Sequence, residues 1–109
     1  MRILRLNNNI CELAEIEKVG EEIKDYAGDL ALTKTLMMIV NEDGRRLAYA
    51  VNEPATALYK SFYNLVVGSV YGPAFLCSYN KDYDLVSLTD EDYETAAKVL
   101  RSYGYVKGD

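Results

Sequence analysis

Residues 65–77, LVVGSVYGPAFLC, form the most apolar stretch of the sequence. The stretch is rich in β-branched and aromatic residues, which favour strands, whereas Gly72-Pro73 favours a break. It predicts two central strands, at about 65–71 and 74–79, joined by a tight turn or a bulge. A single strand kinked at Gly72-Pro73 is the alternative, because proline cannot donate a hydrogen bond within a central strand. The stretch is too short to span a bilayer as a helix, which needs about 20 residues.

Further strands are predicted on both sides of this stretch. Residues 2–6 alternate between polar and apolar, which predicts a first strand, and Asn7–Asn9 predicts the turn after it. Residues 30–40 are predicted to be strand-like, and the unbroken apolar run 36–40 within them is typical of a strand that is covered on both faces. Asn41-Glu42-Asp43-Gly44 predicts a hairpin turn that leads into a return strand over 45–51. A last short strand or an extended arm is expected at residues 85–88.

Two principal helices are predicted to pack on these strands. Apolar residues recur every three or four positions between 13 and 26, which is typical of a helix with one buried face. Thr89 predicts the start of a second helix, over about 90–103, with Asp92 in the position of a capping-box partner. A short helix over 55–63 is expected after Pro54, because proline is favoured in the first turn of a helix.

The predicted fold class is therefore α+β, with a mainly antiparallel sheet of four to six strands packed by two principal helices. The length suits a single domain over residues 1–109. Cys11 and Cys77 are expected to be reduced and buried, because their spacing matches no metal or disulfide motif and no signal peptide is expected. The residues predicted to be mostly buried are Ile39, Leu47, Val67, Val70, Phe75, Leu76 and Leu100.

The charge distribution argues against direct binding of nucleic acid. The chain has 17 acidic and 12 basic residues, which gives a net charge of −5 and an isoelectric point near 4.7. The acids gather in two blocks: residues 12–29 hold seven acids against two lysines, and residues 81–94 hold six against one. A nucleic-acid-binding domain needs a basic footprint, which this composition does not offer. A cytoplasmic protein that contacts no membrane is expected.

The composition also excludes most catalytic and metal chemistry. The chain has no histidine, so it has neither the usual general base near neutral pH nor the commonest metal ligand. Asn80, Asp82, Asp84 and Glu91 occupy positions 1, 3, 5 and 12 of a calcium-loop spacing, but Leu85 stands where that loop needs glycine. A solvated loop before a helix N-terminus is therefore the preferred interpretation. No enzyme, no cofactor and no metal site is predicted.

Tyrosine is unusually abundant, with ten residues against two phenylalanines and no tryptophan. Packing at the edge of the core is one interpretation of these tyrosines. The other is a protein-binding surface, because aromatic side chains surrounded by charge are typical of binding hot spots. The second acidic block offers the best candidates. The predicted protein-binding residues are Tyr79, Asp82, Tyr83, Asp84, Asp90, Glu91 and Asp92.

Residues 39–92 resemble a family of domains of unknown function that is found in bacterial phages and conjugative elements. The resemblance rests on four features: Asn41-Glu42-Asp43-Gly44, Asn52, Val67-Gly68, and Asp84-x-x-Ser87-Leu88-Thr89-Asp90-Glu91. The chain departs from the family pattern at Ala50-Val51-Asn52, where a proline is missing, and at Gly28, where the family has two glycines. The resemblance implies a mobile genetic element as the context and implies no reaction.

Three functions are compatible with these observations. The first is a non-enzymatic protein-binding accessory protein of a mobile genetic element, which includes an inhibitor of a host defence nuclease (anti-CRISPR or anti-restriction) acting through an acidic surface. Its partner would be another protein, such as a nucleic-acid-binding nuclease complex. Carboxylates of this chain can occupy the basic channel of such a complex in place of phosphates. The second is a carboxylate- or metal-dependent small-molecule enzyme or sensor. The third is a structural or regulatory accessory domain that forms a homodimer.

Overall fold

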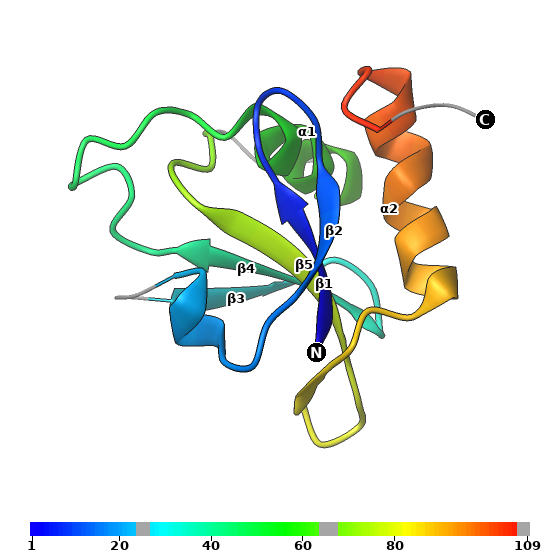
Figure 1. The fold of residues 1–109 in the computed structure, drawn as a ribbon. Helices are drawn as coiled ribbons and strands as arrows, with labels where there is room; N and C mark the ends of the chain where they lie inside the picture. Colours follow the sequence, from blue (N-terminus) through cyan, green and yellow to red (C-terminus); the bar gives the residue numbers. More distant parts are fainter. Residues whose placement is uncertain (24–26, 64–67, 107–109) are drawn as a thin grey trace.

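The structure is a computed structural model that describes residues 1–23, 27–63 and 68–106. It is an α+β fold in which six strands form one antiparallel sheet, with α1 and α2 packed against it (Figure 1). The strand order is β2-β1-β5-β4-β3, and β6 pairs with the end of β5. The strands are β1 (Arg2–Leu6), β2 (Glu12–Glu15), β3 (Ala27–Ala31), β4 (Leu36–Asn41), β5 (Ala74–Tyr79) and β6 (Leu85–Val86). The predicted fold class is confirmed.

The central strands β4 and β5 confirm the predictions for the apolar run 36–40 and for 74–79, but the strand-like segment 30–40 is wrong as one element, because a turn at 32–35 separates β3 from β4. Leu76 of β5 pairs with Met38 of β4 on one side and with Leu4 of β1 on the other. Neighbouring residues of β4 point to opposite faces of the sheet, and Met37 and Met38 enter different clusters of buried side chains. An unbroken apolar run is therefore stable here because both faces of the sheet are covered.

Both helices cover the same face of the sheet. Leu58 of α1 (Glu53–Phe62) and Leu100 of α2 (Asp90–Ser102) belong to one buried cluster with Leu4, Met38 and Leu76. Each helix has an N-terminal cap; the cap at Thr89 was predicted, whereas the one at Asn52 was not. The side chain of Asn52 accepts a hydrogen bond from Ala55 N at the start of α1, and Thr89 Oγ1 accepts one from Asp92 N at the start of α2.

The opposite face is covered by a segment that was predicted to be a helix, and that prediction is wrong. The segment begins as β2, which pairs with β1, and continues into a single 3₁₀ turn, η1 (Val19–Glu21). Ile16 and Ile23 are buried as expected, but Leu13 is 48 % exposed. Residues 24–26 lie outside the described residues. Backbone hydrogen bonds to β1 stabilise the extended form, so the helical spacing of the apolar residues is coincidental.

The predicted return strand over 45–51 is also wrong. Residues 42–48 form consecutive turns, in which Leu47 N donates to Asp43 O, and Ala48 has a φ of 61°. A side chain at Gly44 would overlap the carbonyl oxygen of Tyr71, so the absence of a Cβ permits this close contact. The predicted hairpin is therefore not formed: β4 pairs with β3 and β5, and Val51 has only an isolated bridge to Tyr71.

The first of the two predicted central strands is likewise not formed where it is described. Residues 68–70 have no strand structure, Gly68 has a φ of 136°, and residues 64–67 lie outside the described residues. Tyr71 contributes only the bridge to Val51. The alternative of one kinked strand is therefore also wrong, because regular pairing begins at Ala74, after Pro73.

Most of the predicted core residues are buried. Ile39, Val70, Phe75, Leu76 and Leu100 are confirmed. The predicted burial of Leu47 is wrong, because the turns of residues 42–48 leave this side chain 41 % exposed. Val67 lies outside the described residues. Cys11 and Cys77 are free and buried, as expected. No helix within the described ranges is long and apolar enough to cross a membrane.

Candidate protein-binding site

Four of the predicted site residues lie together on the hairpin between β5 and β6. We call residues 79–84 the tyrosine loop; Figure 1 shows the hairpin projecting beyond the body of the fold. Asn80 organises it, because its Oδ1 accepts hydrogen bonds from Asp82 N (2.9 Å) and Asp84 N (3.0 Å). Tyr83 N donates to Asn80 O, and Asn80 N donates to Asp84 O. Four hydrogen bonds therefore fix the backbone of a short exposed loop.

Tyr83 is the most exposed large apolar side chain among the described residues, at 74 %. Its φ of 65° lies in the left-handed region, which residues other than glycine, asparagine and aspartate rarely adopt. The flanking carboxylates of Asp82 and Asp84 are exposed as well. The loop thus holds an aromatic ring in solvent between two negative charges, in a backbone conformation that is unfavourable for tyrosine.

The ring of Tyr83 stacks on that of Tyr79, with centroids 5.9 Å apart and an interplanar angle of 13°. Tyr79 is half-buried, and its hydroxyl donates a 2.6 Å hydrogen bond to Thr33 O in the β3–β4 turn. Tyr79 therefore acts as a fixed support for Tyr83 and is not a freely exposed contact residue. The stack reduces the rotamer freedom that Tyr83 would lose when a partner binds.

Two of the predicted acids lie at the start of α2. Asp90 is 94 % exposed and forms an ion pair with Arg2, at 3.0 Å, and Glu91 is also exposed. Acids in the first turn interact favourably with the helix dipole, which is a sufficient structural reason for both. Figure 1 shows that α2 begins after the chain has left the hairpin, so these acids form a group separate from the tyrosine loop.

Asp92 does not belong to the protein-binding surface, and that part of the site prediction is wrong. Its side chain is only 4 % exposed and faces the sheet. It accepts hydrogen bonds from Thr35 Oγ1 (2.7 Å) and Ser78 Oγ (2.6 Å). The capping-box role is also wrong, because Thr89 N donates to Ser78 Oγ instead. Asp92 connects α2 to β5 and to the β3–β4 turn.

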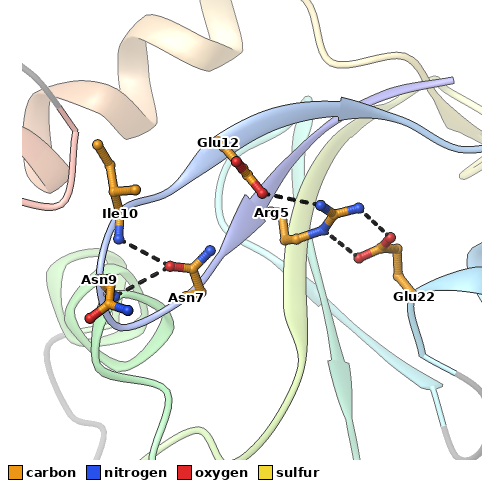
Figure 2. A network of polar contacts seen from close by, with 6 residues as sticks. All are labelled: Arg5, Asn7, Asn9, Ile10, Glu12 and Glu22. Carbon is orange, nitrogen blue, oxygen red and sulfur yellow. Dashed lines mark hydrogen bonds and ion pairs between the residues drawn. The ribbon is translucent and has the colours of Figure 1, made fainter.

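The first acidic block is partly neutralised within the chain. Figure 2 shows Arg5 between two glutamates: it binds both oxygens of Glu22, at 2.6 and 2.8 Å, and reaches Glu12 at 3.2 Å. The hydrogen bond to Glu22 is the main cause of the raised pKa of Arg5. Glu22 thereby connects the segment after η1 to β1. Figure 2 also shows Asn7 forming the predicted turn, by accepting from Asn9 N and Ile10 N.

Sequence reasoning missed the residues that support the site. Asn80 was considered as a calcium ligand, whereas its local hydrogen bonds shape the loop, which is a common role for asparagine in turns. Thr35 and Ser78 carried no signal, because their contact with Asp92 joins segments far apart in the chain. Across the described part of the chain, no three residues of the metal-ligating types lie close enough to hold an ion.

Comparisons with known proteins add no identification. No family model, no curated protein and no solved structure matches the chain.

Proposed function

We propose that this chain is a non-enzymatic, protein-binding accessory protein of a mobile genetic element, acting in the cytoplasm. The tyrosine loop is its proposed contact site. The observation that carries the proposal is Tyr83, an exposed aromatic side chain held at a left-handed backbone position and supported by a stacked ring. Exposed strain of this kind indicates a functional constraint, because a loop without one would favour glycine or asparagine there.

The charges beside Tyr83 suit a basic partner. Asp82 and Asp84 flank the ring, whereas Asp90 and Glu91 form a separate acidic group at the start of α2. An aromatic anchor surrounded by exposed carboxylates fits a pocket with a basic rim. A nuclease with a basic nucleic-acid channel is a partner of this chemistry, so inhibition of a host defence nuclease is one form of the proposed role. The resemblance to a family from phages and conjugative elements supports that context.

The test is a quantitative pull-down with a variant that removes the ring and keeps the loop. Tyr83→Asn is suitable because asparagine tolerates positive φ. Tyr103→Asn is the matched control, because Tyr103 is also well exposed, at 60 %, and lies at the end of α2. We expect a partner captured from host lysate by the parent chain and by Tyr103→Asn, with at least tenfold less captured by Tyr83→Asn.

The charge component is tested separately by Asp82→Lys combined with Asp84→Lys. Association should slow, and the dependence on salt should decrease, because exposed charges are screened over about 10 Å at 0.1 M ionic strength. The reversed pair Glu91→Lys with Asp90→Lys shows whether the start of α2 contributes. Equal capture by the parent chain and Tyr83→Asn at low salt would refute the proposed site.

A further inference from the structure

Strand β2 is an outer strand of the sheet, and its hydrogen bonds show which backbone groups face outward. Met1 and Ile16 exchange two hydrogen bonds, at 2.8 and 2.9 Å, next to the β1–β2 register that pairs Arg2 with Glu15. Bonding alternates along an antiparallel pair, so even-numbered residues of β2 bond to β1. Leu13 and Glu15 consequently direct their N–H and C=O groups away from the sheet.

The same outer edge is already paired at one position. Cys11 N donates a 2.8 Å hydrogen bond to Tyr105 O, from the segment that follows α2. Cys11 is the next outward-facing residue before Leu13, so the edge accepts an added backbone segment there. Within the ranges that the structure describes, no such partner reaches the backbone of Leu13 or Glu15.

The side chains along this edge combine apolar surface with negative charge. Leu13 is about half exposed, and Ile10 at the end of the preceding turn is also exposed. Glu12, Glu15 and Glu17 are exposed carboxylates on the same short segment. Arg5 and the terminal amine each approach one of them, at 3.2 and 3.3 Å, but the segment retains an excess of negative charge.

We infer that the edge of β2 is a second binding site, which accepts an extended basic segment of a partner protein as an additional strand. The outward groups of Leu13 and Glu15 would supply the main-chain hydrogen bonds, and Leu13 would pack against an apolar residue of the added strand. Lysine or arginine on the opposite face of the added strand would face Glu12, whereas Glu15 lies on the same face as Leu13 and adds negative charge at the edge. The inference stands apart from the tyrosine loop, because it depends on backbone pairing at β2.

The negative charge of β2 indicates which kind of strand can bind at this edge. A second copy of the chain would bring the same glutamates to the edge, and like charges on adjacent strands destabilise pairing. Charged residues on an edge strand also prevent aggregation, which is their usual role. Both effects select against neutral and acidic strands and leave a basic strand as the favoured partner.

The test uses a defined probe, the capped peptide KVKVKVK, and the acidic peptide EVEVEVE as its matched control. Hydrogen exchange and amide chemical shifts are followed by NMR on the full chain. At saturating KVKVKVK, exchange of the Leu13 and Glu15 amides should slow at least tenfold, with no such change for EVEVEVE. Unchanged exchange at both amides, or an equal response to the two peptides, would overturn the inference. So would protection of both amides without peptide in a dimeric chain.

Two variants sharpen this test. Leu13→Pro removes an outward N–H without removing a bond to β1, and proline is tolerated on edge strands in that orientation. We expect it to fold and to bind KVKVKVK at least tenfold more weakly. Glu12→Lys combined with Glu15→Lys keeps the backbone edge and should reverse the preference between the two peptides. If Leu13→Pro does not fold, the peptide preference of the Glu12→Lys, Glu15→Lys variant is the deciding measurement. An unchanged preference in that variant would count against the inference.

Discussion

Replacing Asp92 with alanine is expected to lower the free energy of unfolding by at least about 3 kcal/mol. Asp92 is almost fully buried and accepts hydrogen bonds from Ser78 Oγ and Thr35 Oγ1, at 2.6 and 2.7 Å. The substitution removes the only acceptor that the structure gives each of these hydroxyl groups within the described residues. It also disconnects α2 from β5 and from the β3–β4 turn.

The magnitude follows from the surroundings of each hydrogen bond. A bond to a charged group contributes about 1.5–3 kcal/mol, and a buried donor left without a partner adds about 1–3 kcal/mol. Ser78 is buried and should show the larger effect, whereas Thr35 is exposed and can bond to water. The two bonds alone contribute at least about 3 kcal/mol, a large fraction of the 5–15 kcal/mol by which a typical domain is stable. The midpoint of thermal unfolding should fall by at least about 12 °C.

Thermal and urea unfolding followed by circular dichroism would measure this effect. Asp90→Ala is the matched control, because Asp90 lies two residues earlier in the same helix, is exposed, and forms only a surface ion pair with Arg2. It should change stability by less than about 1 kcal/mol. A loss of less than about 1 kcal/mol in Asp92→Ala would refute the reasoning. Folded Asp92→Ala should still bind a partner of the tyrosine loop.

Three further predictions concern stability. Phe75→Ala should lower the free energy of unfolding by about 3–5 kcal/mol, because Phe75 is fully buried in β5; an unchanged urea midpoint would contradict this. Gly44→Ala should destabilise by about 1–3 kcal/mol, since a Cβ would overlap the carbonyl of Tyr71, while Gly20→Ala, with open space around it, should not destabilise in the same unfolding assay. Burial raises the pKa of Cys77 to about 12, so the unfolded chain releases this proton first; stability should fall as pH rises from about 8.5 towards 12, by up to about 1.4 kcal/mol per pH unit. The difference in the free energy of unfolding between pH 8 and pH 10, measured with urea, should be smaller in Cys77→Ala than in the parent chain. The difference that remains comes from the other groups that titrate at alkaline pH.

The candidate site was only partly predictable from the sequence. The exposed acids and Tyr83 follow from a polar stretch between strands, where local composition decides exposure. The role of Tyr79 and the burial of Asp92 could not be predicted from local composition. Tyr79 depends on Thr33 and Asp92 on Thr35, and both threonines lie in a turn more than forty residues away. A carboxylate at the start of a helix has the same sequence signature whether it faces solvent or two hydroxyl groups.

The sequence by itself determined the elements whose stability is local. The strands at 2–6, 36–40 and 74–79 follow from their apolar residues, the start of α2 follows from Thr89, and a helix near 55–63 follows from Pro54. Capping bonds and side-chain alternation involve residues a few positions apart, so they can be recognised without knowledge of the fold.

Only the tertiary structure decided the segments at 12–23 and 42–51. The apolar spacing of the first segment suits a helix, but β1 offers it backbone hydrogen bonds, and the unpaired edge of a strand is a strong competitor for an extended chain. The turn sequence of the second segment suits a hairpin, but close packing of Gly44 on Tyr71 favours consecutive turns. In both segments the deciding contact comes from a distant part of the chain, and local propensities of about 1 kcal/mol per residue are too weak to oppose it.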